Sequence, residues 1–181
     1  MTETDIPSLS SLEYIPYIDE NGQLPEALQG KIGVYAICDR HKALQLIGYS
    51  RDIYLSLKQH LVRQLENCYW IKVQTIQRPS RTLLESIRDA WIEEYGTVPP
   101  GNGEDEAKWN QPIDIKSAMT DEEQASYSSL ASLDELAQAK LLKKVARRVE
   151  EQILTELKSR GVQMEIRFNP KLKESGLLDL K

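Results

Sequence analysis

The chain has 181 residues, a net charge of −5 and 40% hydrophobic residues, which is typical of one globular domain or of one domain with an extension. No run approaches the roughly 18 apolar residues of a membrane span, and the acidic N-terminus has no basic and apolar leader, so no secretion signal is expected. Cys38 and Cys68 are isolated in apolar contexts. We expect buried free thiols in a reducing compartment, the cytoplasm.

Charge is unevenly distributed along the chain. Residues 31–92 hold ten Lys plus Arg against five acids, whereas residues 1–30 hold six acids and residues 101–132 hold seven acids against two lysines. The basic segment predicts either a phosphate-attracting face for nucleic acid or acidic flanks that fold back on it. Scattered, solvated charge explains the pattern equally well.

The first hundred residues read as a lead-in followed by a small α+β domain. Residues 1–30 carry enough apolar side chains to pack on a core. Two short apolar stretches, 33–39 and 43–49, predict strands on either side of a turn. Helical spacing follows at 51–65, alternation at 67–77 and a second helical pattern at 81–95, which Gly96 ends. The expected order is β-β-α-β-α, a small mixed sheet flanked by helices over residues 31–102.

The remaining residues predict an acidic connector at 103–131 and a helix-strand extension at 132–181. Thr120 and Glu123 match a capping box within the connector. Ser132 is the expected cap of a long helix that Gly161 ends. Alternation from Val162 to Phe168 predicts a strand that joins the edge of the core sheet.

Two tripeptides in the predicted strands carry a family resemblance. Gly33-Val34-Tyr35 and Leu46-Ile47-Gly48 lie where the GIY-YIG nuclease superfamily has its two signature tripeptides, and the residues that follow the second keep the register as far as His60. The chain resembles a degenerate member of this superfamily over residues 31–102. As a whole it is similar to uncharacterised GIY-YIG-domain proteins of cyanobacteria and their plastid relatives.

The resemblance implies site residues position by position. Tyr35, His60 and Asn102 match the family's catalytic pattern, whereas Leu46 replaces the second tyrosine and Ser56 replaces the arginine. These losses remove an aromatic hydroxyl and a charge that the family's transition state needs.

The position of the family's metal-binding glutamate falls on Arg88. Without that carboxylate, no metal site and no cofactor are expected, and the chain is expected not to be an enzyme. The alternative is an active endonuclease that uses Mg²⁺ or Mn²⁺, with Glu85 or Asp89 as the displaced ligand.

Three roles therefore follow from the sequence. The first is a binding module for nucleic acid or protein that has lost catalysis. Its expected phosphate contacts are Arg51, Lys58, Arg63 and Arg88. The second is the active endonuclease, and the third is a structural or assembly factor whose acidic flanks cover the old cleft, in which case no salt-dependent nucleic-acid binding is expected.

Overall fold

The computed structural model describes residues 5–130 and 134–181. The chain divides into two compact units, 1–110 and 111–181. The division lies after Asn110, inside the segment that the sequence predicted as a connector. Each unit is described by itself. Among the described residues no helix is long and apolar enough to cross a membrane.

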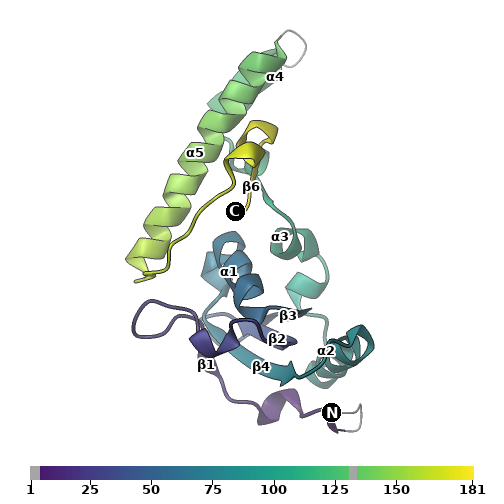
Figure 1. Ribbon diagram of the computed structural model, residues 1–181. Helices are drawn as coiled ribbons and strands as arrows, with labels where there is room; N and C mark the ends of the chain where they lie inside the picture. The colour runs from purple at the N-terminus through teal and green to yellow at the C-terminus, as the bar shows by residue number, and fades with distance from the viewer. Residues whose placement is uncertain (1–4, 131–133) are drawn as a thin grey trace. The chain divides into compact units, whose positions relative to one another are not determined.

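The first unit is built on a four-stranded sheet (Figure 1). Its strands are β1 (Ile15–Pro16), β2 (Ile32–Cys38), β3 (Leu44–Ser50) and β4 (Trp70–Ile76), in the spatial order β1-β4-β2-β3. All three strand pairs are antiparallel rather than mixed. Helices α1 (Ile53–Arg63), α2 (Arg81–Tyr95) and α3 (Glu106–Asn110) complete the unit. The α+β class and the β-β-α-β-α order of the core are confirmed.

Helices α1 and α2 cover opposite faces of the sheet. Successive side chains of a strand point to opposite faces. Val34 and Ala36 of β2 pack in one cluster with Leu84, Ile87 and Trp91 of α2. The residue between them, Tyr35, instead reaches α1, as described below. Both helices start at a side-chain cap, Asp52 for α1 and Ser80 for α2.

The lead-in contributes to the core of this unit. Tyr17 and Leu24 are almost fully buried, and the Tyr17 hydroxyl donates to the carbonyl oxygen of Leu57 in α1. On the other face, the Trp91 indole donates to the Pro7 carbonyl oxygen at 3.0 Å. The lead-in also contains the two-residue strand β1, which places Pro16 at a sheet edge, where a missing N–H is tolerated.

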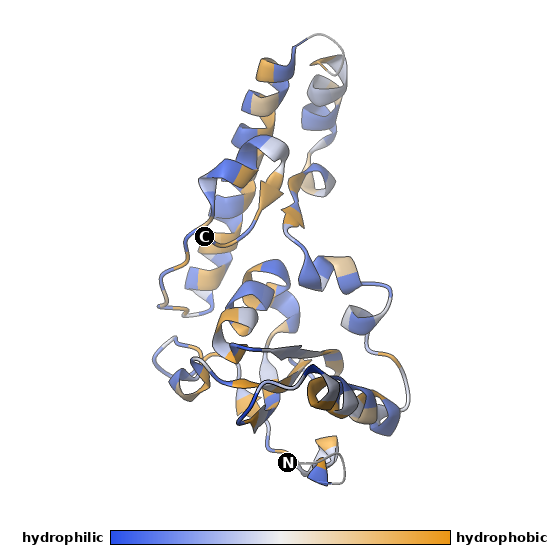
Figure 2. Ribbon diagram, turned by 45° about the vertical axis from the view of Figure 1, so that its right-hand side comes forward, coloured by the Kyte–Doolittle hydropathy of each residue, from blue (hydrophilic) through white to orange (hydrophobic). Residues whose placement is uncertain are grey.

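The second unit is a pair of helices with a small two-stranded sheet. Its helices are α4 (Asp121–Leu130) and α5 (Glu135–Ser159), and its strands β5 (Ile113–Asp114) and β6 (Leu177–Leu178) are antiparallel. Apolar residues recur along α5 (Figure 2). The predicted capping box of α4 is confirmed, since Thr120 and Glu123 exchange hydrogen bonds of 2.9 and 3.1 Å. The predicted cap Ser132 lies outside the described residues; Asp134 caps α5.

The predicted strand at Val162–Phe168 is wrong. The segment is not a strand, and only Phe168 forms an isolated bridge, with Leu180. The extra strand of this unit is β6, which pairs with β5 and does not join the core sheet. Val162 and Phe168 are nevertheless buried while the intervening Gln163, Glu165 and Arg167 are exposed. The alternation therefore records one buried side of an extended segment, not a strand ladder.

Candidate functional site: a polar cleft at the sheet edge

Strand β3 is an edge of the sheet, and Asn102 closes part of that edge. The Asn102 side chain accepts from the Ile47 N–H at 2.8 Å and donates to the Ile47 carbonyl oxygen at 2.7 Å. It thus replaces a neighbouring strand at one residue. The close approach requires Gly101, because a Cβ there would lie 2.8 Å from the Gln45 carbonyl oxygen. Main-chain groups alternate in direction along an antiparallel strand, so the main chain of Tyr49 also faces outward.

Tyr35 reaches this edge by lying across Gly48. The two residues are paired neighbours on β2 and β3, and a Cβ on Gly48 would meet the Tyr35 hydroxyl at 2.7 Å. The Tyr35 hydroxyl lies 2.8 Å from Nε2 of His60 on α1, and Nδ1 of His60 lies 2.9 Å from the Trp109 carbonyl oxygen. A carbonyl oxygen only accepts, so Nδ1 carries the proton and Nε2 accepts from Tyr35.

Burial controls the protonation of this pair. It raises the pKa of the Tyr35 phenol well above its usual range, and the Ser56 hydroxyl and the Arg63 charge oppose the shift only in part. Burial also lowers the pKa of His60 to about 4, although the bond to Trp109 acts in the opposite direction. Near neutral pH the phenol is therefore protonated and the imidazole neutral, so Tyr35 directs its proton inward and a lone pair of its oxygen is left for other partners.

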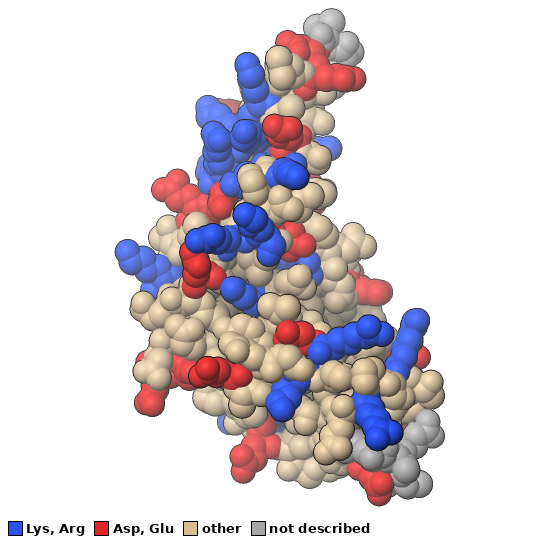
Figure 3. Space-filling model, in the orientation of Figure 1, with Lys and Arg blue, Asp and Glu red and all other residues tan. Residues whose placement is uncertain are grey.

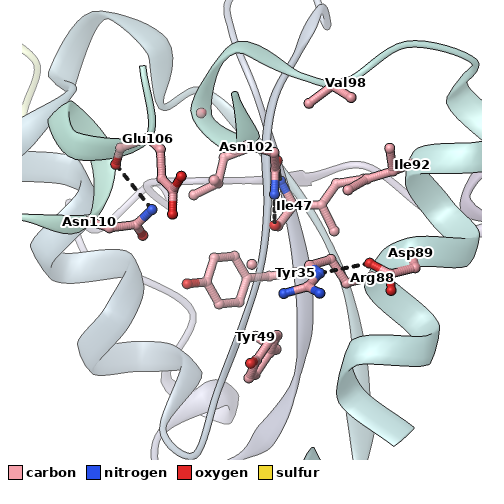
Figure 4. Close-up of a pocket in the computed structure, with 13 residues that line it drawn as sticks. Tyr35, Ile47, Tyr49, Arg88, Asp89, Ile92, Val98, Asn102, Glu106 and Asn110 are labelled. Atoms are coloured by element: carbon pink, nitrogen blue, oxygen red, sulfur yellow. Dashed lines mark hydrogen bonds and ion pairs between the residues drawn. The ribbon is translucent and has the colours of Figure 1, made fainter. Parts of the chain in front are cut away.

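A cleft of about 590 Å³ opens beside Tyr35 (Figure 4). We call it the sheet-edge cleft. Strands β2 and β3, helices α2 and α3 and the turn at Asn102 supply its walls, which are lined by Tyr35, Leu46, Ile47, Gly48, Tyr49, Arg88, Asp89, Ile92, Val98, Gly101, Asn102, Glu106 and Asn110. Cavities of this size accommodate small organic ligands.

Arg88 supplies the positive charge of the cleft. Its Nε donates to Asp89 at 3.0 Å, and its guanidinium lies 5.4 Å from the ring centre of Tyr49. Figure 4 shows the guanidinium beside Tyr35, with its terminal nitrogens turned away from Asp89. Among the described residues no hydrogen bond or ion pair involves those terminal nitrogens. The cleft also holds two carboxylates, that of Asp89 next to Arg88 and that of Glu106 on the opposite wall. Beside Glu106, the Asn110 side chain donates to the main-chain oxygen of Glu106 at 3.1 Å.

The structure brings together some of the predicted site residues. Tyr35 and Asn102 line the sheet-edge cleft, and His60 lies directly behind Tyr35. Leu46 and Arg88, which stand at positions of lost family residues, also line it. A place in or behind the cleft does not by itself assign a function to any of these residues.

Ser56 and Glu85 have other partners. The Ser56 hydroxyl donates to that of Ser50 at 2.7 Å. Glu85 accepts from Arg81 at 2.8 Å and from the Tyr49 hydroxyl at 3.1 Å, and these bonds, that of Arg81 first, lower its pKa. Within residues 5–130 and 134–181 no three potential metal ligands come together. Glu85 and Asp89, the alternative metal ligands, therefore belong to no such group.

The four expected phosphate contacts do not form one surface. Arg51 is exposed and Lys58 half-buried, whereas Arg63 turns inward and donates to the Trp109 carbonyl oxygen at 3.1 Å. Only Arg88 lines the cleft. In the view of Figure 3, basic and acidic side chains alternate over the first unit, and a denser group of basic side chains lies on the second unit. On the face shown, the basic side chains of the first unit therefore do not form one continuous patch.

Sequence reasoning missed Glu106, Asn110 and the Trp109 carbonyl oxygen. All three belong to α3, a five-residue helix inside the segment predicted as a connector. The sequence signal was there in part, because Pro99-Pro100-Gly101-Asn102 predicts a turn and Trp109 an apolar anchor. Trp109 is only 1% exposed, and its burial holds α3 against α1.

Comparison with known proteins gives one informative relative. No family model matches the chain. The chain is similar to the bifunctional monothiol glutaredoxin-S16, chloroplastic, of Arabidopsis thaliana, with 38% identity over 101 residues. The match covers 54% of this chain and 33% of the relative, so the chain spans about a third of the length of the protein that it matches. The relative is named as bifunctional. Because the match covers only a third of it, its activity can be considered for this chain only as a proposal.

This finding corrects the predicted family. The matched relative is named as a glutaredoxin and no family model supports the nuclease assignment. The GIY-YIG assignment and the nuclease-derived roles based on it are therefore withdrawn. The physical reason is the brevity of the motif. Gly33 and Gly48 are required by packing, since a Cβ on Gly33 would lie 2.3 Å from the Gln74 carbonyl oxygen and one on Gly48 would strike Tyr35. Short glycine motifs of this kind report close approach of strands.

The relative's name directs attention to the thiols. Cys38 is 3% exposed and Cys68 0% exposed. Burial raises the pKa of the Cys38 thiol to about 11, although Lys72 opposes the shift. Reactive thiols lie in accessible, electropositive surroundings that stabilise the thiolate. Neither cysteine of this chain has such a setting.

Proposed function

We propose that the first unit is a binding domain that holds a small phosphate ester in the sheet-edge cleft, with Arg88 as the anchor for the phosphate. The observation that carries the proposal is the Arg88 guanidinium: Asp89 and Tyr49 hold it, and its terminal N–H groups are left for a ligand. Such a planar group fits phosphate oxygens with two parallel hydrogen bonds.

The opposite wall narrows the class of ligand. Glu106 and Asn110 offer acceptors for ligand N–H groups, and Ile92 and Val98 offer apolar contact for its body. A second anionic group near Glu106 would be repelled. The cleft therefore favours a ligand with one phosphate at one end and N–H donors at the other, as in a nucleoside monophosphate.

For this cleft we propose ligand binding and not catalysis. Tyr35 directs its proton to His60, and the lowered pKa of His60 makes the imidazole a weak proton acceptor. The pair is thus suited to fix the orientation of the phenol oxygen as an acceptor for ligand hydroxyl groups.

The test is a titration of the full chain with a nucleoside monophosphate, followed by ¹H–¹⁵N NMR. Replacing Arg88 by Gln removes a charge-assisted bond of about 1.5–3 kcal/mol, so Kd should rise about tenfold or more. The matched control is Arg78→Gln, which removes an exposed arginine outside the cleft and should leave Kd unchanged. Equal affinity of the two variants would overturn the proposal.

An oligonucleotide in the same titration separates the two sources of phosphate. Preference for the monophosphate supports the proposed ligand. Tighter binding of the oligonucleotide, with steep salt dependence, would instead favour the predicted nucleic-acid partner. A protein partner and a cytoplasmic location stay predictions; the relative is named as chloroplastic.

A thiol redox function is the second candidate, because the relative's name carries it. It can be tested with a thiol-specific disulfide reagent on the native chain. Since Cys38 and Cys68 are buried, we expect neither to react until the chain is unfolded. Rapid reaction of either thiol in the native state would support redox chemistry on this chain.

A further inference from the structure

A second cavity lies on the α2 side of the sheet and shares no lining residue with the sheet-edge cleft. It encloses about 230 Å³. Its walls come from the lead-in, the turn between β2 and β3, strand β4 and the end of α2, and are formed by Leu9, Ser10, Tyr14, Cys38, Lys42, Leu44, Lys72, Glu94 and Tyr95. We call it the lysine pocket.

Lys72 is the unusual residue of this pocket. It is a charged side chain, yet it is only 7% exposed. Its Nζ donates to the Leu9 carbonyl oxygen at 3.0 Å and lies 4.2 Å from the ring centre of Tyr14. Among the described residues no carboxylate pairs with it. An ammonium group carries three N–H donors, and a buried charge without a counter-ion is costly.

A second ammonium group lies over the same ring. Nζ of Lys42 is 4.7 Å from the ring centre of Tyr14 and 5.0 Å from that of Trp70. The left-handed backbone of Lys42, with φ 64°, belongs to the tight turn between β2 and β3. Like charges near one ring repel each other, and an anion that contacts both ammonium groups would relieve this repulsion.

The one carboxylate in the pocket wall is already engaged. The two oxygens of Glu94 accept from the main-chain N–H groups of Leu9 and Ser10, at 2.8 and 2.9 Å. The described lining thus holds two ammonium groups and a single carboxylate that is occupied by the main chain. No carboxylate of the described lining is therefore left to pair with the buried Lys72 or with Lys42.

We propose that the lysine pocket binds a small organic carboxylate, with the carboxylate between Lys42 and Lys72 and the apolar body against Leu9 and Leu44. Both leucines are less than a tenth exposed, so the wall that faces the ligand body is apolar. An inorganic phosphate would keep more of its hydration and make no use of that wall, whereas an aromatic or short aliphatic acid satisfies the charges and the wall together.

Benzoate is a suitable probe, because nine heavy atoms fit a cavity of 230 Å³. We expect saturable shifts of the amide signals of residues 9–10, 42–44 and 72 in ¹H–¹⁵N NMR, with Kd in the range of about 1 mM that small ligands of this size reach. Inorganic phosphate is the comparison ligand and should bind at least tenfold more weakly.

Two variants make the assignment falsifiable. Lys72→Met keeps the length of the side chain, removes the buried charge and should raise Kd at least tenfold without loss of folding. Lys42→Met alters an exposed position and should raise Kd severalfold. The control Lys31→Met removes an exposed lysine elsewhere on the unit and should leave Kd unchanged. Unchanged affinity in Lys72→Met and Lys42→Met, or absence of saturable shifts in the wild-type chain, would overturn the proposal.

Discussion

The buried His60 couples the stability of the first unit to pH. Its imidazole is 4% exposed, donates from Nδ1 to Trp109 and accepts at Nε2 from Tyr35, an arrangement that only the neutral ring can make. Protonation in the folded state would place a charge in the core and remove the acceptor. Burial therefore lowers the folded-state pKa to about 4, from an ordinary value of 6.5.

The sign of the effect follows from proton counting. As pH falls below about 6.5, the unfolded chain binds a proton at His60 and the folded chain does not. The contribution of His60 to stability is present above the unfolded-state pKa and is lost as pH falls toward 4. Between about pH 7 and about pH 5 the free energy of unfolding should fall by about 2 kcal/mol from this group alone.

Urea unfolding followed by tryptophan fluorescence measures this loss at a series of pH values. His60→Gln removes the titrating group and should flatten the pH dependence by about 2 kcal/mol over that interval. His41→Gln is the matched control, because it changes the chain's other histidine, which is exposed in the turn between β2 and β3. Parallel pH profiles for the wild-type chain and His60→Gln would refute the reasoning.

Two further predictions concern the backbone of the cleft. Gly48→Ala should cost about 1–3 kcal/mol in unfolding free energy, because the new Cβ would lie 2.7 Å from the Tyr35 hydroxyl and displace the ring from His60; the His60 ring signals in NMR report the displacement. Asn102→Ala should cost about 2 kcal/mol, since it leaves the N–H and carbonyl groups of Ile47 without a partner; faster hydrogen exchange at the Ile47 amide checks it. A stable Gly48→Ala variant with an unchanged His60 environment, or unchanged exchange at Ile47, would contradict them.

The core elements of the first unit could be predicted because their periodicity is local. Strands β2, β3 and β4 and helices α1 and α2 lie where apolar spacing placed them, within a few residues at each end. Packing on both faces of the sheet strengthens this spacing, since each helix must bury one apolar stripe. The segment at 162–168 has the same alternation without being a strand. Alternation records which side chains are buried and does not say whether another strand is available to pair.

The candidate site was predictable only in part, because it depends on strand order. Tyr35, His60 and Asn102 were singled out by the resemblance to the nuclease superfamily, which the comparison overturned. Tyr35 and Asn102 meet at the cleft, with His60 behind Tyr35, only because β3 is an outer strand in the order β1-β4-β2-β3. Nothing local in the sequence states that order. Glu106 and Asn110 reach the cleft from a short helix that Trp109 anchors, so their place depends on a long-range contact of one buried indole.

The same long-range packing explains why a short motif is weak evidence of chemistry here. Gly33 lies two residues before Tyr35 on β2 and is fixed by contact with the main chain of β4, whereas Gly48 on β3 is fixed by contact with the Tyr35 ring. With the Tyr35 ring laid across β3, there is no room for a Cβ at Gly48, whatever the cleft beside it binds. The tripeptides therefore specify where the phenol lies. The proposed phosphate binding depends most on residues outside them, Arg88 and Glu106, and substitutions there are expected to change the ligand without changing the fold.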